Sequence, residues 1–170
     1  FPVEGRCPNG YENQIECEQN VWVTDRLIPT CVLPLSLIST LRLIPQFATL
    51  GIGCRKGTSC GEIGKAVNVV LERYGISMDA VAVVASADVK AQEKGLFDFV
   101  EKYRKELRFF TAEQLNAVPV PNPSKHAMEH LGIHSVSEAS ALLGAGEGGT
   151  LLAEKTVFDA VTVALAKMRE

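Results

Sequence analysis

The clearest pattern of hydrophobic and polar positions predicts a helix between Ser59 and Gly75. Apolar residues recur there at intervals of three and four, the spacing of one face of an α-helix. These positions are Ile63, Ala66, Val67, Val70 and Leu71. Thr58 and Ser59 can cap the start of the helix, and Gly75 can supply the left-handed residue at which helices commonly end.

Apolar runs predict three strands. Residues 48–53 form a short run that ends in glycines, and residues 80–85 form a continuous run typical of a strand covered on both faces. A shorter run follows at residues 107–110, after a helical stripe over residues 95–103. Strands that alternate with helices in this way favour a sheet with parallel neighbours.

Two capping boxes predict helices in the second half of the chain. Thr111 with Gln114, and Ser135 with Glu138, have the spacing in which each side chain bonds the other residue's backbone N–H. The second of these helices should end near Gly144. Between them Ser124 can cap a short helix that ends at Gly132.

The tail of the chain reads as a β-hairpin. The β-rich runs at residues 150–153 and 160–166 are joined around Phe158 and Asp159. A hairpin adds antiparallel pairing, so we expect an α/β fold: a mixed, mostly parallel sheet flanked by helices over residues 48–170. Residues 1–47 hold five of the eight prolines and show no sustained helical period, so we expect an irregular N-terminal extension with a short strand at Val21–Val23.

Composition narrows the function classes. Seventeen basic and twenty acidic side chains leave a net charge of −3, so the chain lacks the basic excess expected of a nucleic-acid partner. Pro34, Arg42 and Pro45 interrupt the longest apolar stretches, and none approaches the roughly 20 residues of a membrane helix. The five cysteines are an odd number without Cys-x-x-Cys spacing, which favours a reduced, cytoplasmic protein.

The first candidate site follows the predicted strand at residues 48–53. Glycines there would let the backbone approach a ligand, the first turn of the next helix would offer free N–H groups, and two basic side chains add positive charge. Its candidate binding residues are Gly51, Gly53, Cys54, Arg55, Lys56, Gly57, Thr58 and Ser59. The glycine spacing matches neither the dinucleotide fingerprint nor the Walker loop. A tight turn with two solvated basic side chains would show the same pattern.

The second candidate site follows the predicted strand at residues 80–85. If the two strands are neighbours in an open α/β sheet, both sites lie at the edge where ligands bind. Ser86, Lys90 and Glu93 are candidate binding residues, and Asp88 is the candidate catalytic residue, because these groups can orient a polar substrate or exchange protons. A capped helix followed by an exposed turn is the alternative.

Cysteine and histidine chemistry has weaker support. A helix N-terminus and Arg55 would lower the pKa of the Cys54 thiol, but no histidine is nearby in sequence to act as its base. His126, His130 and His134 are spaced by four, yet Gly132 interrupts their helix and no acidic residue completes a metal motif. We therefore interpret the histidines as surface residues and expect no metal site in the protein.

Five further segments can be compared with known families: residues 51–59, 85–96, 109–118, 135–143 and 161–166, which together span about 120 residues. In this order they resemble the C-terminal domain of the cobalt-precorrin-5A hydrolases of cobalamin biosynthesis, a domain also found as a stand-alone protein. Val21–Arg26 is similar to the end of that family's middle domain. The resemblance thus divides the chain into residues 1–47, resembling the end of the middle domain, and residues 48–170, the C-terminal domain.

The resemblance implies an α/β fold and a hydrolase that opens a ring-fused lactone on a cobalt tetrapyrrole with release of acetaldehyde. It implies no cofactor of the protein's own, because the substrate carries the cobalt. The substrate's acetate and propionate carboxylates suit a basic loop at a helix N-terminus. Expected partners are this tetrapyrrole, and other corrin-pathway enzymes or the family's N-terminal domains.

Two other functions are compatible with the same residues. A non-catalytic corrinoid carrier would need the same loop, since it must bind the same carboxylates. A nucleotide- or phosphate-binding module would use the same helix N-terminus.

Overall fold

A computed structural model describes residues 20–23 and 40–169 of the chain, and these fall into two units. In the first unit, β1 (Asn20–Val23) pairs in parallel with β2 (Thr40–Leu43). The predicted strand at residues 21–23 is confirmed, whereas β2 lies in a segment expected to be irregular. The remaining expectations for the extension, including Cys7, Cys17 and Cys31, lie outside the described residues.

The second unit, which includes all residues from Pro45 onward, is built on a five-stranded sheet with the order β5-β4-β3-β7-β6. Its strands are β3 (Ala48–Cys54), β4 (Val81–Ala87), β5 (Glu106–Phe110), β6 (Thr150–Val157) and β7 (Val161–Lys167). β3, β4 and β5 run parallel, and β7 runs antiparallel to both of its neighbours. Only β7 therefore opposes the common direction, which confirms the mixed, mostly parallel sheet.

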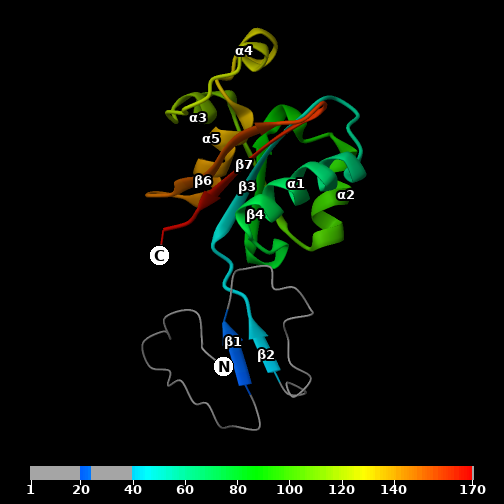
Figure 1. The fold of residues 1–170 in the computed structure, drawn as a ribbon. Coiled ribbons are helices and arrows are strands. Elements are labelled where there is room, and N and C mark those ends of the chain that lie inside the picture. The colour runs from blue at the N-terminus through cyan, green and yellow to red at the C-terminus, as the bar shows by residue number, and fades with distance from the viewer. Residues whose placement is uncertain (1–19, 24–39, 170) are drawn as a thin grey trace. The chain divides into compact units, whose positions relative to one another are not determined.

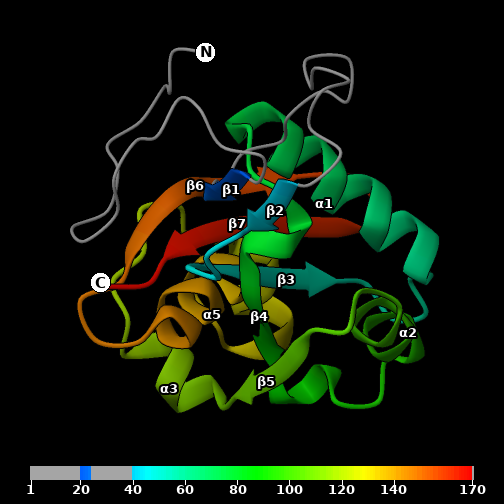
Figure 2. The ribbon, with the colours of Figure 1, turned by 90° about the horizontal axis from the view of Figure 1, so that it is seen from below.

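Helices cover both faces of this sheet (Figure 1). They are α1 (Cys60–Tyr74), α2 (Lys94–Tyr103), α3 (Ala112–Asn116), α4 (Lys125–Leu131) and α5 (Val136–Ala145). Figure 2 shows α1 and α5 on opposite sides of β3. The predicted helices are confirmed, and the described part of the chain contains no helix of the length and apolarity that a membrane span requires.

Helix α1 follows the predicted pattern closely. Ser59 is its N-cap and forms a capping box with Glu62, and Gly75 ends the helix in the left-handed conformation at φ 66°. The five apolar positions of the predicted face are its buried residues. The loop that leaves β3 therefore leads into the N-terminus of a fifteen-residue helix.

Helix α5 packs unusually close to β3 because both elements carry small residues where they meet. A Cβ atom on Gly51 would overlap the carbonyl oxygen of Ser137 and lie 2.7 Å from the backbone nitrogen of Ala141. A Cβ atom on Gly144 would likewise lie too close to the Thr49 side chain. Since side chains alternate along a strand, Leu50 points to the opposite face, and it is fully buried there.

The two ends of the α/β unit meet beside the start of β3. The Met168 backbone N–H donates to the carbonyl oxygen of Phe47 at 2.7 Å, and the Phe47 N–H donates to the carbonyl oxygen of Ala80 at 3.0 Å. At the other end of the sheet, Phe158 and Val161 close the predicted hairpin through a 2.8 Å backbone hydrogen bond.

Candidate functional site

The two predicted loops meet at the carboxyl edge of the sheet, the edge at which β3, β4 and β5 end. Residues 55–59 leave β3 and residues 88–93 leave β4, its parallel neighbour. The Gly57 backbone N–H donates to the Glu93 carboxylate at 2.8 Å, which joins the loops directly. Gly95 packs so tightly on Thr58 that a Cβ atom there would overlap the Thr58 carbonyl oxygen.

The glycines of the first candidate site have separate roles. Gly51 and Gly53 lie within β3, where Gly51 lets α5 approach and a Cβ on Gly53 would lie 2.5 Å from Thr162 Oγ1. The structure thus gives both of them a packing reason, independent of any ligand. Gly57 lies in the loop itself, has φ 78° and faces open space.

Two backbone N–H groups at the start of α1 already bond protein carboxylates. Besides the Gly57–Glu93 contact, the Ser59 N–H donates to Glu62 Oε2 at 2.9 Å. The Ser59 hydroxyl also donates to this carboxylate, and these hydrogen bonds lower the pKa of Glu62. The carboxylates that bond these N–H groups are therefore side chains of the chain itself.

The basic residues of the loops differ in exposure. Arg55 is 68% exposed and lies 3.6 Å from the Asp159 carboxylate in the hairpin turn, and Lys56 is also exposed. Lys90, in contrast, is only 14% exposed and lies 3.8 Å from Glu93, which is 13% exposed. Arg55 and Lys56 are thus exposed cations at this edge of the sheet, and Lys90 is a largely buried one.

A hollow of about 250 Å³ lies next to the loops, between the first turns of α1 and α2. It is lined by Gly57, Thr58, Ser59, Cys60, Lys94, Gly95 and Asp98. The ammonium of Lys94 is held by Asp98 at 2.6 Å, and this hydrogen bond and the charge of Asp98 raise the pKa of Lys94.

The expectation of an acidic Cys54 thiol is wrong. Burial raises the pKa of Cys54 to about 11, and the positive charge of Lys90 offsets only part of this effect while Glu93 adds to it. Arg55, the expected activating group, points instead toward Asp159 and is largely solvated. Near neutral pH the thiol is protonated, which does not favour a nucleophilic role.

Of the residues predicted to follow the strand at residues 80–85, Ser86 lies within β4 and the others follow β4. Ser86 is fully buried, and its hydroxyl donates to the Ile52 carbonyl oxygen at 2.7 Å across the β3–β4 pair. Asp88 is exposed at the start of a short 3-10 helix (Asp88–Lys90). The structure brings Lys90 and Glu93 to the first loop, and it leaves Asp88 open to solvent.

A second polar cluster, absent from the sequence predictions, surrounds Glu138. This fully buried carboxylate accepts hydrogen bonds from the backbone N–H and the side-chain amide of Asn122, at 3.2 and 2.9 Å, and from the Lys155 N–H at 3.0 Å. The Lys155 ammonium donates to the Asn122 carbonyl oxygen. The predicted capping box of Ser135 and Glu138 is therefore wrong, because Ser135 makes no side-chain cap and Glu138 turns to Asn122.

The Glu138 cluster lies near the same edge as the loops. Val136, in the first turn of α5, lies against Gly53 near the end of β3. The hydroxyls of Ser135 and Ser137 are buried there without a hydrogen-bond partner. The spacing of a capping box concealed this cluster, and only the long-range position of Asn122 distinguishes the two arrangements.

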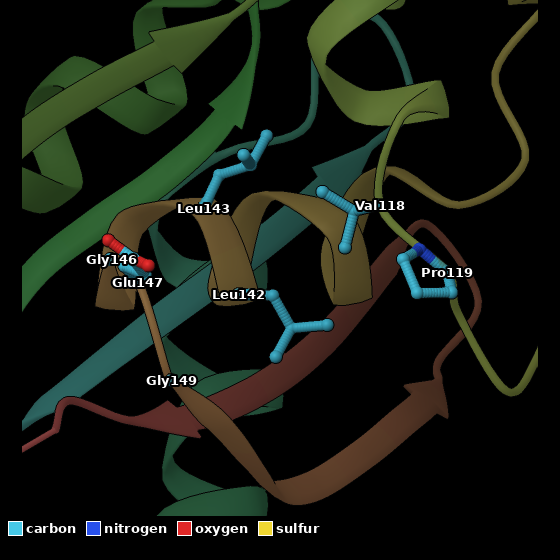
Figure 3. A pocket seen from close by; sticks show the side chains of 7 residues that line it. All are labelled: Val118, Pro119, Leu142, Leu143, Gly146, Glu147 and Gly149. Atoms are coloured by element: carbon cyan, nitrogen blue, oxygen red, sulfur yellow. The ribbon is translucent and has the colours of Figure 1, made fainter.

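Figure 3 shows the side chains around a larger hollow of about 400 Å³. It is lined by Val118, Pro119, Leu142, Leu143, Gly146, Glu147 and Gly149, and includes no predicted site residue. Its 146–149 segment precedes Thr150, which pairs with Lys167 beside the start of β3. We place the candidate site at the carboxyl edge because the charged and hydrogen-bonding groups gather there.

Metal-binding geometry is absent from residues 20–23 and 40–169, where no group of three or more His, Cys, Asp or Glu side chains could hold an ion. His130 and His134 are exposed.

Known proteins resemble this chain over the α/β unit. The chain is 30% identical over 122 residues to a cobalt-precorrin-5A hydrolase of Priestia megaterium, covering 72% of this chain and 32% of that protein. It is 31% identical over 119 residues to Protein CobE of a Sinorhizobium species, covering 69% of this chain and 77% of that protein. The chain thus spans about a third of the hydrolase and most of CobE.

Solved structures show the same fold. A crystal structure of CobE, described as a protein from the cobalamin biosynthetic pathway, matches with a TM-score of 0.69 and 31% identity over 74% of this chain and 93% of that one. The cobalamin biosynthesis protein chiG of Agrobacterium tumefaciens matches with a TM-score of 0.58 and 35% identity, over 72% of this chain and 99% of that chain. Residues 48–166 match the family model described as cobalamin synthesis G C-terminus, and the chain belongs to that family.

Proposed function

We propose that the chain binds a cobalt tetrapyrrole through its peripheral carboxylates and forms part of a cobalt-precorrin-5A hydrolase. Membership of a cobalamin-synthesis family supports a role in cobalamin biosynthesis. The name of the Priestia megaterium relative, cobalt-precorrin-5A hydrolase, supports a hydrolase. The reaction we propose is the one that the family resemblance implies, in which the substrate lactone is opened and acetaldehyde is released.

The observation that carries this proposal is the meeting of two cation-bearing loops at one edge of the sheet. Arg55 and Lys56 follow β3, and Lys90 follows β4. The close packing of Gly95 on Thr58 and the Gly57–Glu93 hydrogen bond bring the two loops together. Several cations around one edge suit a ring with carboxylates along its rim, since each contact can bind a different carboxylate. The N-terminus of α1 adds to the positive potential.

Replacing Arg55 and Lys56 with alanine tests the binding part of the proposal. We expect at least about tenfold weaker binding of a cobalt corrin that carries free carboxylates, because partly desolvated charge-assisted contacts contribute about 1.5–3 kcal/mol. Isothermal titration calorimetry at low salt measures the effect, which should shrink as salt rises. The matched control replaces Lys65 and Arg73, two exposed cations farther along α1. Equal binding by the Arg55/Lys56 variant and the parent would refute the site.

The catalytic part has a separate test. Asp88 is the proposed catalytic residue, so Asp88→Asn in the complete hydrolase should slow acetaldehyde release far more than it weakens corrin binding. Release is measured anaerobically with the cobalt-lactone substrate. Parent-like turnover of this variant would remove Asp88 from the reaction.

A corrinoid carrier is the second candidate function. It is favoured by the comparison with CobE, which this chain covers over 93% of the solved chain, because a unit of this size occurs there without further domains. Corrin binding by residues 1–170 without acetaldehyde release, even after the remaining hydrolase domains are added, would support the carrier.

A further inference from the structure

We propose that the Glu93 carboxylate is an internal stand-in for a ligand carboxylate, which a carboxylate on the corrin rim displaces from Lys90 and from the Gly57 N–H. The proposal deepens the function proposed above and rests on it. It assigns Glu93 as a competitor of the ligand, and Lys90 as the cation that the ligand gains.

The position of Glu93 has the chemistry of a carboxylate-binding site. One carboxylate oxygen accepts from the Gly57 N–H at 2.8 Å, and the other lies 3.8 Å from the Lys90 ammonium. A backbone N–H near a helix N-terminus, together with an ammonium group, is the combination that proteins use to hold carboxylates and phosphates. In the structure this combination is occupied by the Glu93 side chain of the same chain.

Displacing Glu93 from Lys90 costs little free energy because the contact between them is long. A charge-assisted hydrogen bond between an ammonium and a carboxylate is about 2.7–2.9 Å long, so the 3.8 Å contact is an ion pair without a close hydrogen bond. Glu93 is the N-cap residue of α2, yet its side chain makes no cap hydrogen bond, so the helix does not depend on it. A ligand carboxylate replaces one anion by another and leaves no buried cation unpaired.

The local backbone is uncrowded around Gly57. This exposed residue has a left-handed φ of 78°, and a Cβ atom there would meet nothing within 4 Å. The adjoining hollow of about 250 Å³ gives room beside the loop. Arg55 and Lys56, both exposed at the rim, are placed to meet other carboxylates of the same ring.

The test is whether Glu93→Gln strengthens ligand binding instead of weakening it. The glutamine side chain can still accept from the Gly57 N–H, but it no longer pairs with Lys90. We expect this variant to bind a cobalt corrin with free carboxylates about three- to tenfold more tightly than the parent, and to bind citrate, a simple polycarboxylate, more tightly as well. Lys90→Gln should weaken both interactions.

Glu62→Gln is the matched control, because it removes the same charge from the same helix N-terminus without contacting Lys90. Its affinity for both probes should stay within about twofold of the parent. Tighter citrate binding by Glu93→Gln, with no corrin bound by any variant, would support the exchange while refuting the proposed function. Unchanged or weaker binding of both probes by Glu93→Gln, or no binding of either, would overturn the exchange.

Discussion

Glycine serves two separate purposes within seven residues of this chain. At Gly51 the missing side chain makes room for the backbone of α5, while at Gly57 it permits a left-handed turn that faces open space. The same residue type therefore contributes to the core at one position and to the shape of a candidate binding loop at the other. We therefore expect substitutions at Gly51 and at Gly57 to have different effects.

Gly51→Ala should destabilise the protein strongly. The new Cβ atom would overlap the Ser137 carbonyl oxygen, so α5 must move away from β3, at an expected cost of at least about 1–3 kcal/mol. Urea unfolding followed by circular dichroism measures the change. The control is Gly61→Ala on the exposed side of α1, where the nearest atom would be 3.9 Å away and the free energy of unfolding should be unchanged or slightly higher.

The Cys54 thiol should react slowly in the folded protein. With its pKa raised to about 11, only about one thiol in a thousand is ionised at about pH 8, and the thiolate is the reactive form. Iodoacetamide should therefore modify Cys54 at least about tenfold more slowly in buffer than in urea, as peptide mass spectrometry would show. The native rate should rise with pH up to about pH 11, and fast modification at neutral pH would contradict the burial argument.

At the scale of elements, α5 joins the sheet to the segment before it. Its buried carboxylate, Glu138, binds the Asn122 connector and the Lys155 backbone of β6 at once. Its small residues meanwhile bring the helix close to β3. A single helix thus orders three separate stretches of the chain.

Glu138→Ala should cost about 3 kcal/mol or more in the free energy of unfolding. The change leaves three donors on the half-buried Asn122 and Lys155 without their acceptor, and each donor left unsatisfied costs about 1 kcal/mol or more. Thermal and urea unfolding measure the loss. Glu154→Ala is the control, since Glu154 is exposed and accepts a separate hydrogen bond from the Asn122 side-chain amide. Equal effects of the two substitutions would rule out a special role for the buried carboxylate.

Local patterns predicted the elements well because their causes are local. The cap at Ser59, the stop at Gly75 and the capping box of Thr111 with Gln114 depend on residues within one turn, and all three are confirmed. The pairing of β7 between β3 and β6 was predicted only as a hairpin in a mixed sheet, because strand order depends on contacts between distant segments.

The candidate site was less accessible to sequence reasoning. Adjacent loops could be inferred from the strands, but the direction of each side chain could not. Cys54 shows why, since its pKa depends on burial and on Lys90, thirty-six residues later, rather than on the neighbouring Arg55. Glu138 shows the converse: a correct local spacing was overridden by Asn122, sixteen residues earlier.

At the scale of the whole molecule, the unit that includes all residues from Pro45 onward has an apolar core of its own. Where burial is described, the buried apolar residues run from Ala48 to Ala166. We therefore expect a fragment of residues 45–170 to unfold cooperatively, with a melting temperature within about 5 °C of the full chain, because it retains all of these buried residues. Circular dichroism on both proteins tests this. Loss of the cooperative transition in the fragment would show that residues 1–44 contribute to the core.

The hydrogen bond between Phe47 and Met168 places the two ends of the α/β unit side by side. A short peptide could therefore join these two ends. The chain could then be opened in the exposed hairpin turn at Asp159 to give a circular permutant with the same sheet. Ends that meet also let a unit be spliced into another protein as a cassette, since the host chain enters and leaves at one point. The same closure suits a unit that recurs both as a separate chain and as a third of a larger enzyme.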